Sequence, residues 1–132
     1  MALAEGLGVI PYSPLGGGLL TGKYGLDKQK ASGRLVGNKM YDIRYGEGWM
    51  FEAAVAFAQL AKERGYDAAG MAVAWVGAHP GVTAPIIGAR NLEQLEGSLK
   101  AVDVKMTREL YAEIAALTPS PALATDRSEE RT

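Results

Sequence analysis

Two short runs in this 132-residue chain have the composition of buried strands, and helical patterns separate them along the sequence. Residues 8–12 and 82–87 are apolar and contain β-branched side chains, which is typical of strands. Pro11 lacks a backbone N–H, so it restricts the first run to a strand end or a bulge. Strands separated by helices pair in parallel, so the order predicts an α/β fold. Two strands alone leave open edges and uncovered faces, so this pair needs further structure around it.

Four helices are predicted around these runs. Residues 49–64 carry one apolar face and end before Gly65; the face consists of Met50, Ala53, Ala54, Phe57, Leu60 and Ala61. A second helix follows Asp67 as its N-cap and is apolar on most sides until His79, so we expect it to be buried. A third follows Asn91, with Gln94 in capping-box spacing. The last follows Thr107 and buries Leu110, Tyr111, Ile114 and Leu117.

The rest of the chain lacks a sustained period. Residues 16–48 have neither strand nor helix periodicity and exceed the length of a plain loop, so we predict a long loop there that is either functional or disordered. Prolines and charged residues in 119–132 predict a disordered tail. Residues 1–118 then form one domain.

A glycine-rich segment directly follows the first predicted strand. Gly16, Gly17, Gly18 and Gly22 allow backbone amides to approach an anion closely, and Lys23 adds a positive charge. The spacing from Gly17 to Lys23 is close to that of a P-loop, but Tyr24 stands where a magnesium-binding Ser or Thr is needed. Two interpretations therefore remain, a cradle for a phosphate-bearing ligand or a plain glycine-rich turn.

A second candidate anion site follows the second predicted strand. Gly88 and Arg90 lead into the helix capped by Asn91, where free amides and the helix dipole favour a negative charge. Tyr12 lies at the carboxyl end of the first strand, where an aromatic ring either stacks on a flat heterocycle or packs in the core.

Composition excludes several functions. The formal net charge is −1, which gives no reason to expect nucleic acid, and the chain has no run of about 18 apolar residues to span a membrane. Residues 1–5 lack the basic and apolar parts of a leader and there is no cysteine, so we expect a cytoplasmic protein.

His79 has no carboxylate nearby in sequence, and no metal-ligand spacing occurs. Binding is therefore better supported than catalysis; the candidate proton donors are Tyr24, Tyr41 and Tyr45, none with a recognisable base.

The two glycine motifs and the residues between them resemble the C-terminal portion of an aldo-keto reductase. The stretches that carry this resemblance are residues 6–16, 21–23, 74–75, 79–82, 85–91 and 94–96. The resemblance implies a helix-rich, partial (β/α)8 (TIM) barrel with about the last two βα units and the C-terminal helices. A whole barrel needs eight strands.

The resemblance also implies NADPH as cofactor, a small carbonyl substrate and roles for particular residues. Tyr12 would stack on the nicotinamide, and the pyrophosphate would lie along Ser13, Pro14, Leu15, Gly16 and Gly18. Lys23 and Arg34 would belong to the loop that covers the cofactor. The adenosine 2′-phosphate would be surrounded by Gly88, Ala89, Arg90 and Gln94. Ser98 would lie at the adenine, where Gly97 and Ser98 replace the glutamate and asparagine common in the family.

The family's catalytic tetrad of Asp, Tyr, Lys and His comes from the first half of its barrel and matches no position here. We therefore expect an NADP(H)-binding portion of an aldo-keto reductase with weak or no catalysis of its own. Two alternatives remain. One is an oligomeric carbonyl reductase with a rebuilt active site, and the other is a non-catalytic module or half-barrel that needs a separate N-terminal partner.

Overall fold

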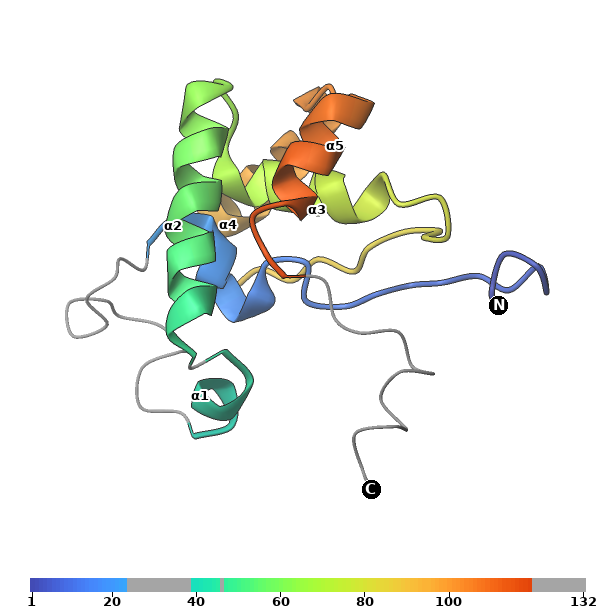
Figure 1. The fold of residues 1–132 in the computed structure, drawn as a ribbon, viewed down its shortest axis with the longest axis horizontal. Helices are drawn as coiled ribbons and strands as arrows, with labels where there is room; N and C mark the ends of the chain where they lie inside the picture. Colours follow the sequence, from blue (N-terminus) through green and yellow to red (C-terminus); the bar gives the residue numbers. More distant parts are fainter. Residues whose placement is uncertain (24–38, 46, 120–132) are drawn as a thin grey trace.

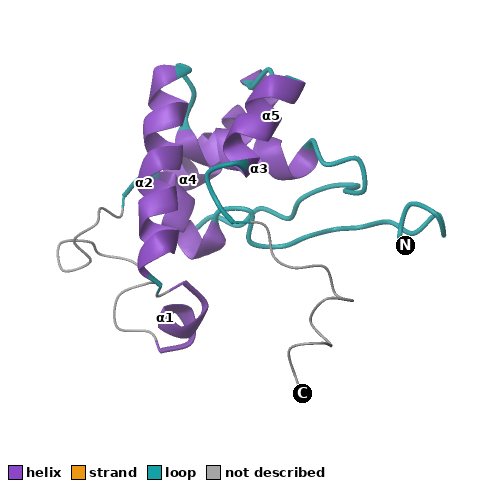
Figure 2. Ribbon diagram, viewed as in Figure 1, coloured by secondary structure: helices purple, strands orange, loops and turns teal. Residues whose placement is uncertain are grey.

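The computed structural model describes residues 1–23, 39–45 and 47–119, and these residues form a helical assembly beside two extended segments (Figures 1 and 2). In chain order the elements are η1 (Gly16–Thr21), α1 (Lys39–Tyr45), α2 (Gly48–Glu63), α3 (Ala68–Gly77), α4 (Leu92–Leu99), η3 (Lys100–Asp103) and α5 (Arg108–Ala115). The helix-rich character predicted from the sequence is confirmed.

The two predicted strands lie side by side, but they do not form regular strands within the described residues. A single parallel bridge joins Tyr12 to Ile86. Around it, Thr83 N–H donates to the Val9 carbonyl and Ile86 N–H to the Pro11 carbonyl, both at 2.8 Å. The parallel direction is thus confirmed, whereas the prediction of two strands is wrong. A regular ladder fails because Pro11 and Pro85 lack N–H donors and these two segments alone form a marginal sheet.

The predicted helix ends are confirmed by their caps. Asp67 Oδ1 accepts from the N–H groups of Ala69 (2.9 Å) and Gly70 (3.2 Å), which satisfies two free donors at the start of α3. After α2, Gly65 takes a left-handed φ of 73°, a conformation that suits glycine. Tyr66 N–H then donates to the Ala61 carbonyl at 2.9 Å, which turns the chain sharply from α2 toward α3.

The core lies where α2, α3 and α5 meet. It consists of Phe57, Leu60 and Ala61 from α2, Met71 and Ala72 from α3, and Leu110 and Ile114 from α5. On its border, the Trp75 and Tyr111 rings stack with centroids 5.3 Å apart, and Trp75 Nε1–H donates to the Tyr111 carbonyl at 3.1 Å. The apolar faces predicted for these helices are the ones that pack together.

The stretch predicted as a loop, residues 16–48, contains two helical elements. Gly16–Thr21 forms the 3-10 element η1, and Lys39–Tyr45 forms α1. Leu19 of η1 packs against Phe51 and Ala54 of α2 in a second small core, and this burial stabilises a helix that periodicity does not reveal. Residues 24–38 and 120–132, which include Arg34 and most of the predicted tail, lie outside the described residues.

Candidate functional site

A groove of about 670 Å3 lies at the carboxyl ends of the two extended segments. Tyr12 and Ile86, the two bridged residues, both line it. Open α/β sheets and (β/α)8 barrels place their ligands at the carboxyl ends of parallel strands. The volume falls in the range of small-molecule sites, which runs from about 300 to 1,000 Å3.

The first wall of the groove comes from the glycine-rich segment. Residues that line the groove there are Tyr12, Ser13, Pro14, Leu15, Gly17, Gly18, Thr21 and Lys23. The backbone is compact because Gly16 N–H donates to the Ser13 carbonyl and Gly18 N–H to the Leu15 carbonyl, both at 3.0 Å. Gly17 and Gly18 have φ of 68° and 100°, a conformation that favours glycine at both positions.

Two features of this wall are unusual. Ser13 has a φ of 57° and is the one non-glycine residue with positive φ among the described residues. Such strained backbone clusters at functional sites. Tyr12 is 72% exposed and lines the groove, so the alternative in which Tyr12 packs in the core is wrong.

The second wall is the turn into α4. Ile86, Ile87, Gly88, Arg90, Asn91 and Gln94 line the groove here. Asn91 Oδ1 accepts from Gln94 N–H at 2.9 Å, as the capping box predicts. Gln94 Oε1, however, accepts from Arg90 N–H at 3.1 Å. These two amides are therefore occupied by side chains, and the positive charge available to a ligand at this turn comes mainly from the Arg90 guanidinium.

The far end of the groove contains four residues that the sequence did not single out as site residues, beside Gly97, which the family resemblance places at the adenine. Asp67, Ala69, Glu96, Gly97 and Lys100 line it. Lys100 Nζ lies 3.5 Å from Asp67 Oδ2, so the cap of α3 is also part of an ion pair at the groove. Asp67 was predicted from the sequence as the N-cap of α3. Nothing in the sequence indicates that Lys100, which follows α4, forms an ion pair with Asp67.

The groove contains both signs of charge. Lys23, Arg90 and Lys100 line it, and so do Asp67, Glu93 and Glu96. With three groups of each sign, the groove has no net positive charge of its own. An anionic ligand would therefore be attracted at particular cations rather than by the groove as a whole.

Three of the predicted cofactor residues do not line the groove. Gly16 and Ala89 are neighbours of lining residues, while Ser98 is 2% exposed on the buried side of α4. Ser98 Oγ has no hydrogen-bond partner among the described residues. Arg34 and Tyr24 lie outside the described residues.

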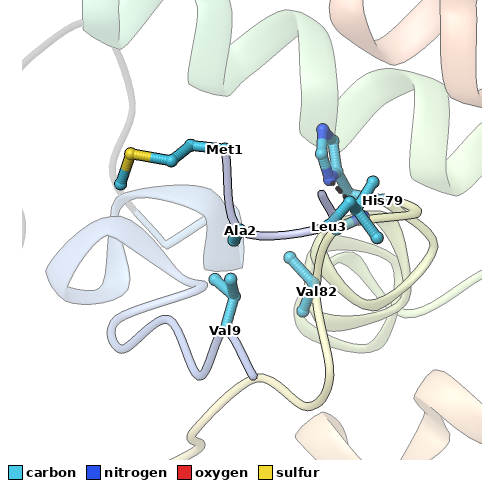
Figure 3. A pocket seen from close by; sticks show the side chains of 7 residues that line it. Met1, Ala2, Leu3, Val9, His79 and Val82 are labelled. Atoms are coloured by element: carbon cyan, nitrogen blue, oxygen red, sulfur yellow. Dashed lines mark hydrogen bonds between the residues drawn. The ribbon is translucent and has the colours of Figure 1, made fainter. Parts of the chain in front are cut away.

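His79 lies at the opposite end of the extended segments from the groove. It borders an apolar pocket of about 400 Å3 with Met1, Ala2, Leu3, Val9, Gly81 and Val82 (Figure 3). Its Nδ1 accepts from Gly81 N–H at 3.0 Å, so this nitrogen stabilises a turn. His79 is therefore far from the candidate site.

In the described part of the chain, no group of three His, Asp or Glu side chains is placed to bind a metal, and no helix is long and apolar enough to cross a membrane.

Taken together, a groove at the carboxyl ends of parallel segments and a glycine-rich wall are typical of α/β proteins that bind small ligands. Comparison with known proteins makes the class specific: the aldo/keto reductase family model matches residues 1–119. The chain belongs to this family, whose fold is the (β/α)8 barrel and whose members bind a nicotinamide cofactor and carbonyl substrates.

Several curated proteins are similar to this chain. An uncharacterized oxidoreductase, YrpG of Bacillus subtilis, is 40% identical over 116 residues, which cover 88% of this chain and 33% of YrpG. Protein tas of Escherichia coli is 33% identical over 115 residues, or 86% of this chain and 32% of tas. The L-glyceraldehyde 3-phosphate reductase of Escherichia coli is 35% identical over 105 residues, or 75% and 30% of the two chains. The chain thus spans about a third of the length of these relatives.

Proposed function

We propose that this chain forms the NADP(H)-binding part of an aldo/keto reductase, an enzyme that reduces aldehydes and ketones. The observation that carries the proposal is the groove, because two motifs about 70 residues apart in sequence line it together. A single ligand in the groove would be in reach of residues from both motifs, whereas each motif alone is consistent with an ordinary turn.

The residues of the groove fit such a cofactor. The exposed Tyr12 ring would stack on the nicotinamide, and the left-handed backbone at Gly17 and Gly18 would allow close approach of the pyrophosphate. Arg90 would bind the adenosine 2′-phosphate, since a guanidinium binds phosphate in a bidentate manner. When bound, the cofactor supplies a hydride for carbonyl reduction.

The same groove supports binding better than catalysis. The family's Asp, Tyr, Lys and His tetrad has no counterpart at matching positions of this sequence, and His79 lies at the other end of the extended segments. A carbonyl reductase needs a proton donor beside the substrate oxygen. We therefore propose that intrinsic turnover is weak or absent and that the residues for proton transfer come from elsewhere in a complete barrel.

A fluorescence titration with NADPH tests this proposal. We expect saturable binding that Arg90→Ala weakens roughly 10- to 100-fold, because a hydrogen bond to a charged group contributes about 1.5–3 kcal/mol. The loss should be much smaller for NADH, which lacks the 2′-phosphate. Arg108→Ala is the matched control, since Arg108 is exposed at the start of α5 and does not line the groove.

The nicotinamide end is tested separately. Tyr12→Ala should weaken binding of both NADPH and NADH, while Tyr12→Phe should keep the stacking and change little. Absence of saturable binding, or equal affinities for wild type, Arg90→Ala and Tyr12→Ala, would refute the proposal. Steady NADPH oxidation with an aromatic aldehyde would instead support the alternative of a rebuilt active site.

A further inference from the structure

The far end of the groove combines two small residues with two opposite charges. Ala69 at the start of α3 and Gly97 in α4 both line it, and a Cβ built on Gly97 would lie 3.9 Å from that of Ala69. Because glycine has no side chain and alanine has only a methyl group, a planar ring can approach both backbones closely there. Asp67 Oδ1 would lie 3.7 Å from the Gly97 Cβ, and Lys100 lies beside Asp67. These residues suit a flat ligand group with a polar edge.

The two charged groups are placed as a neighbouring hydrogen-bond acceptor and donor. Asp67 Oδ1 caps α3, since it accepts from the N–H groups of Ala69 and Gly70. Within the described residues Asp67 Oδ2 forms no hydrogen bond. Lys100 Nζ lies 3.5 Å from it, a distance longer than the about 2.7–2.9 Å of a charge-assisted hydrogen bond. Both side chains are partly exposed, Asp67 by 32% and Lys100 by 57%, so a ligand can bind to either group.

We propose that Asp67 and Lys100 select adenine as the base of the bound nucleotide, an inference that rests on the proposed function. An adenine edge presents its 6-amino group, a donor, beside a ring nitrogen that accepts. Asp67 Oδ2 would accept from the amino group, and Lys100 Nζ would donate to the ring nitrogen. A base with a carbonyl at position 6 would instead bring an oxygen against the Asp67 carboxylate, with no proton between them.

The positions at which the family commonly has glutamate and asparagine do not supply these groups here. Gly97 has no side chain, and Ser98 is 2% exposed on the buried side of α4 and does not line the groove. Arg90 precedes α4 and Lys100 follows it, and the eight residues of α4 span about 12 Å. A nucleotide whose 2′-phosphate binds Arg90 would therefore extend its base along α4 toward Lys100 and Asp67.

A comparison of NADPH with its hypoxanthine analogue, in which a carbonyl replaces the 6-amino group, tests this inference. Fluorescence titrations of the whole chain give both affinities. We expect wild type to bind NADPH at least about tenfold more tightly, because the analogue removes one charge-assisted hydrogen bond. Asp67→Asn keeps the oxygen that caps α3 and places an amide N–H at the position of Oδ2, so its preference should shrink to about threefold or less. Lys100→Met should weaken NADPH binding several-fold.

Asp103→Asn is the matched control. It makes the same chemical change at an exposed residue of η3 that does not line the groove, so it should keep the preference of wild type. The readout is a ratio of two affinities of one protein, so a general loss of stability in Asp67→Asn does not imitate it. Equal affinities of wild type for the two cofactors, or an unchanged preference in Asp67→Asn, would overturn the inference while NADPH binding stands. Absence of saturable NADPH binding would refute the proposed function itself, and this inference with it.

Discussion

Replacing Gly70 with alanine should destabilise the protein, although alanine is the better helix former. Gly70 is buried within α3, and a Cβ built on it would lie 3.0 Å from the Lys100 carbonyl carbon and 3.1 Å from the Ala101 nitrogen. Both atoms belong to the backbone of η3, so a side-chain rotation cannot relieve the contact. The separation of α3 from η3 would have to increase by several tenths of an ångström.

The expected magnitude follows from two opposing terms. Alanine in place of a helical glycine contributes about 1 kcal/mol to stability. Forcing one extra carbon into a close-packed contact costs about 1–3 kcal/mol. The overpacking term dominates here because the clash is with backbone, so we expect Gly70→Ala to lower the free energy of unfolding by about 1 kcal/mol.

Gly97→Ala is the matched control. Gly97 lies inside α4, and the nearest atom to its added Cβ is Asp67 Oδ1 at 3.7 Å, an ordinary contact. This variant should gain up to about 1 kcal/mol, so the two substitutions should differ by about 2 kcal/mol in opposite directions. Urea unfolding followed by far-UV circular dichroism measures both. A Gly70→Ala protein as stable as Gly97→Ala would refute the packing argument.

Three further predictions concern α5 and its contacts. Thr107→Ala should lower stability by about 1 kcal/mol in urea unfolding, because the Thr107 hydroxyl caps α5. The pKa of Glu109 lies below its ordinary value because its carboxylate accepts from its own N–H and from the Thr107 hydroxyl. That stabilisation is complete above the unfolded pKa and is lost as pH falls through the folded pKa, so Glu109→Gln should flatten the acid side of a Tm-versus-pH profile. Trp75→Phe should cost about 1 kcal/mol, because it removes the hydrogen bond to the Tyr111 carbonyl while keeping a ring there.

Controls separate these effects from general damage. Thr107→Ser keeps the capping hydroxyl and should restore most of the stability. Glu52→Gln, on the exposed side of α2, should leave the acid side of the profile unchanged. Trp49→Phe removes an indole on the surface and should have a much smaller effect than Trp75→Phe. A capping variant without loss, or a pH profile insensitive to Glu109, would contradict the account of α5.

Much of the helical framework could be predicted from the sequence because its signals are local. Asp67, Asn91 and Thr107 are N-caps because their side chains bond to amides within three residues, and Gly65 ends α2 for an equally local reason. The parallel direction of residues 8–12 and 82–87 also follows from the helices between them. The irregular pairing of these two segments was harder to predict, because regular strand pairing depends on which other segments lie beside a strand in the folded structure.

The sequence by itself determined the family, the ends of α2 and the N-caps of α3, α4 and α5, and the two glycine motifs, since each depends on residues near one another in the chain. Only the tertiary structure decided that both motifs line one groove and that Lys100 reaches Asp67 there. It also placed Ser98 on the buried side of α4 and left the Tyr12 ring exposed. The physical reason is that burial and charge pairing depend on how helices pack, and packing joins residues that no local pattern relates.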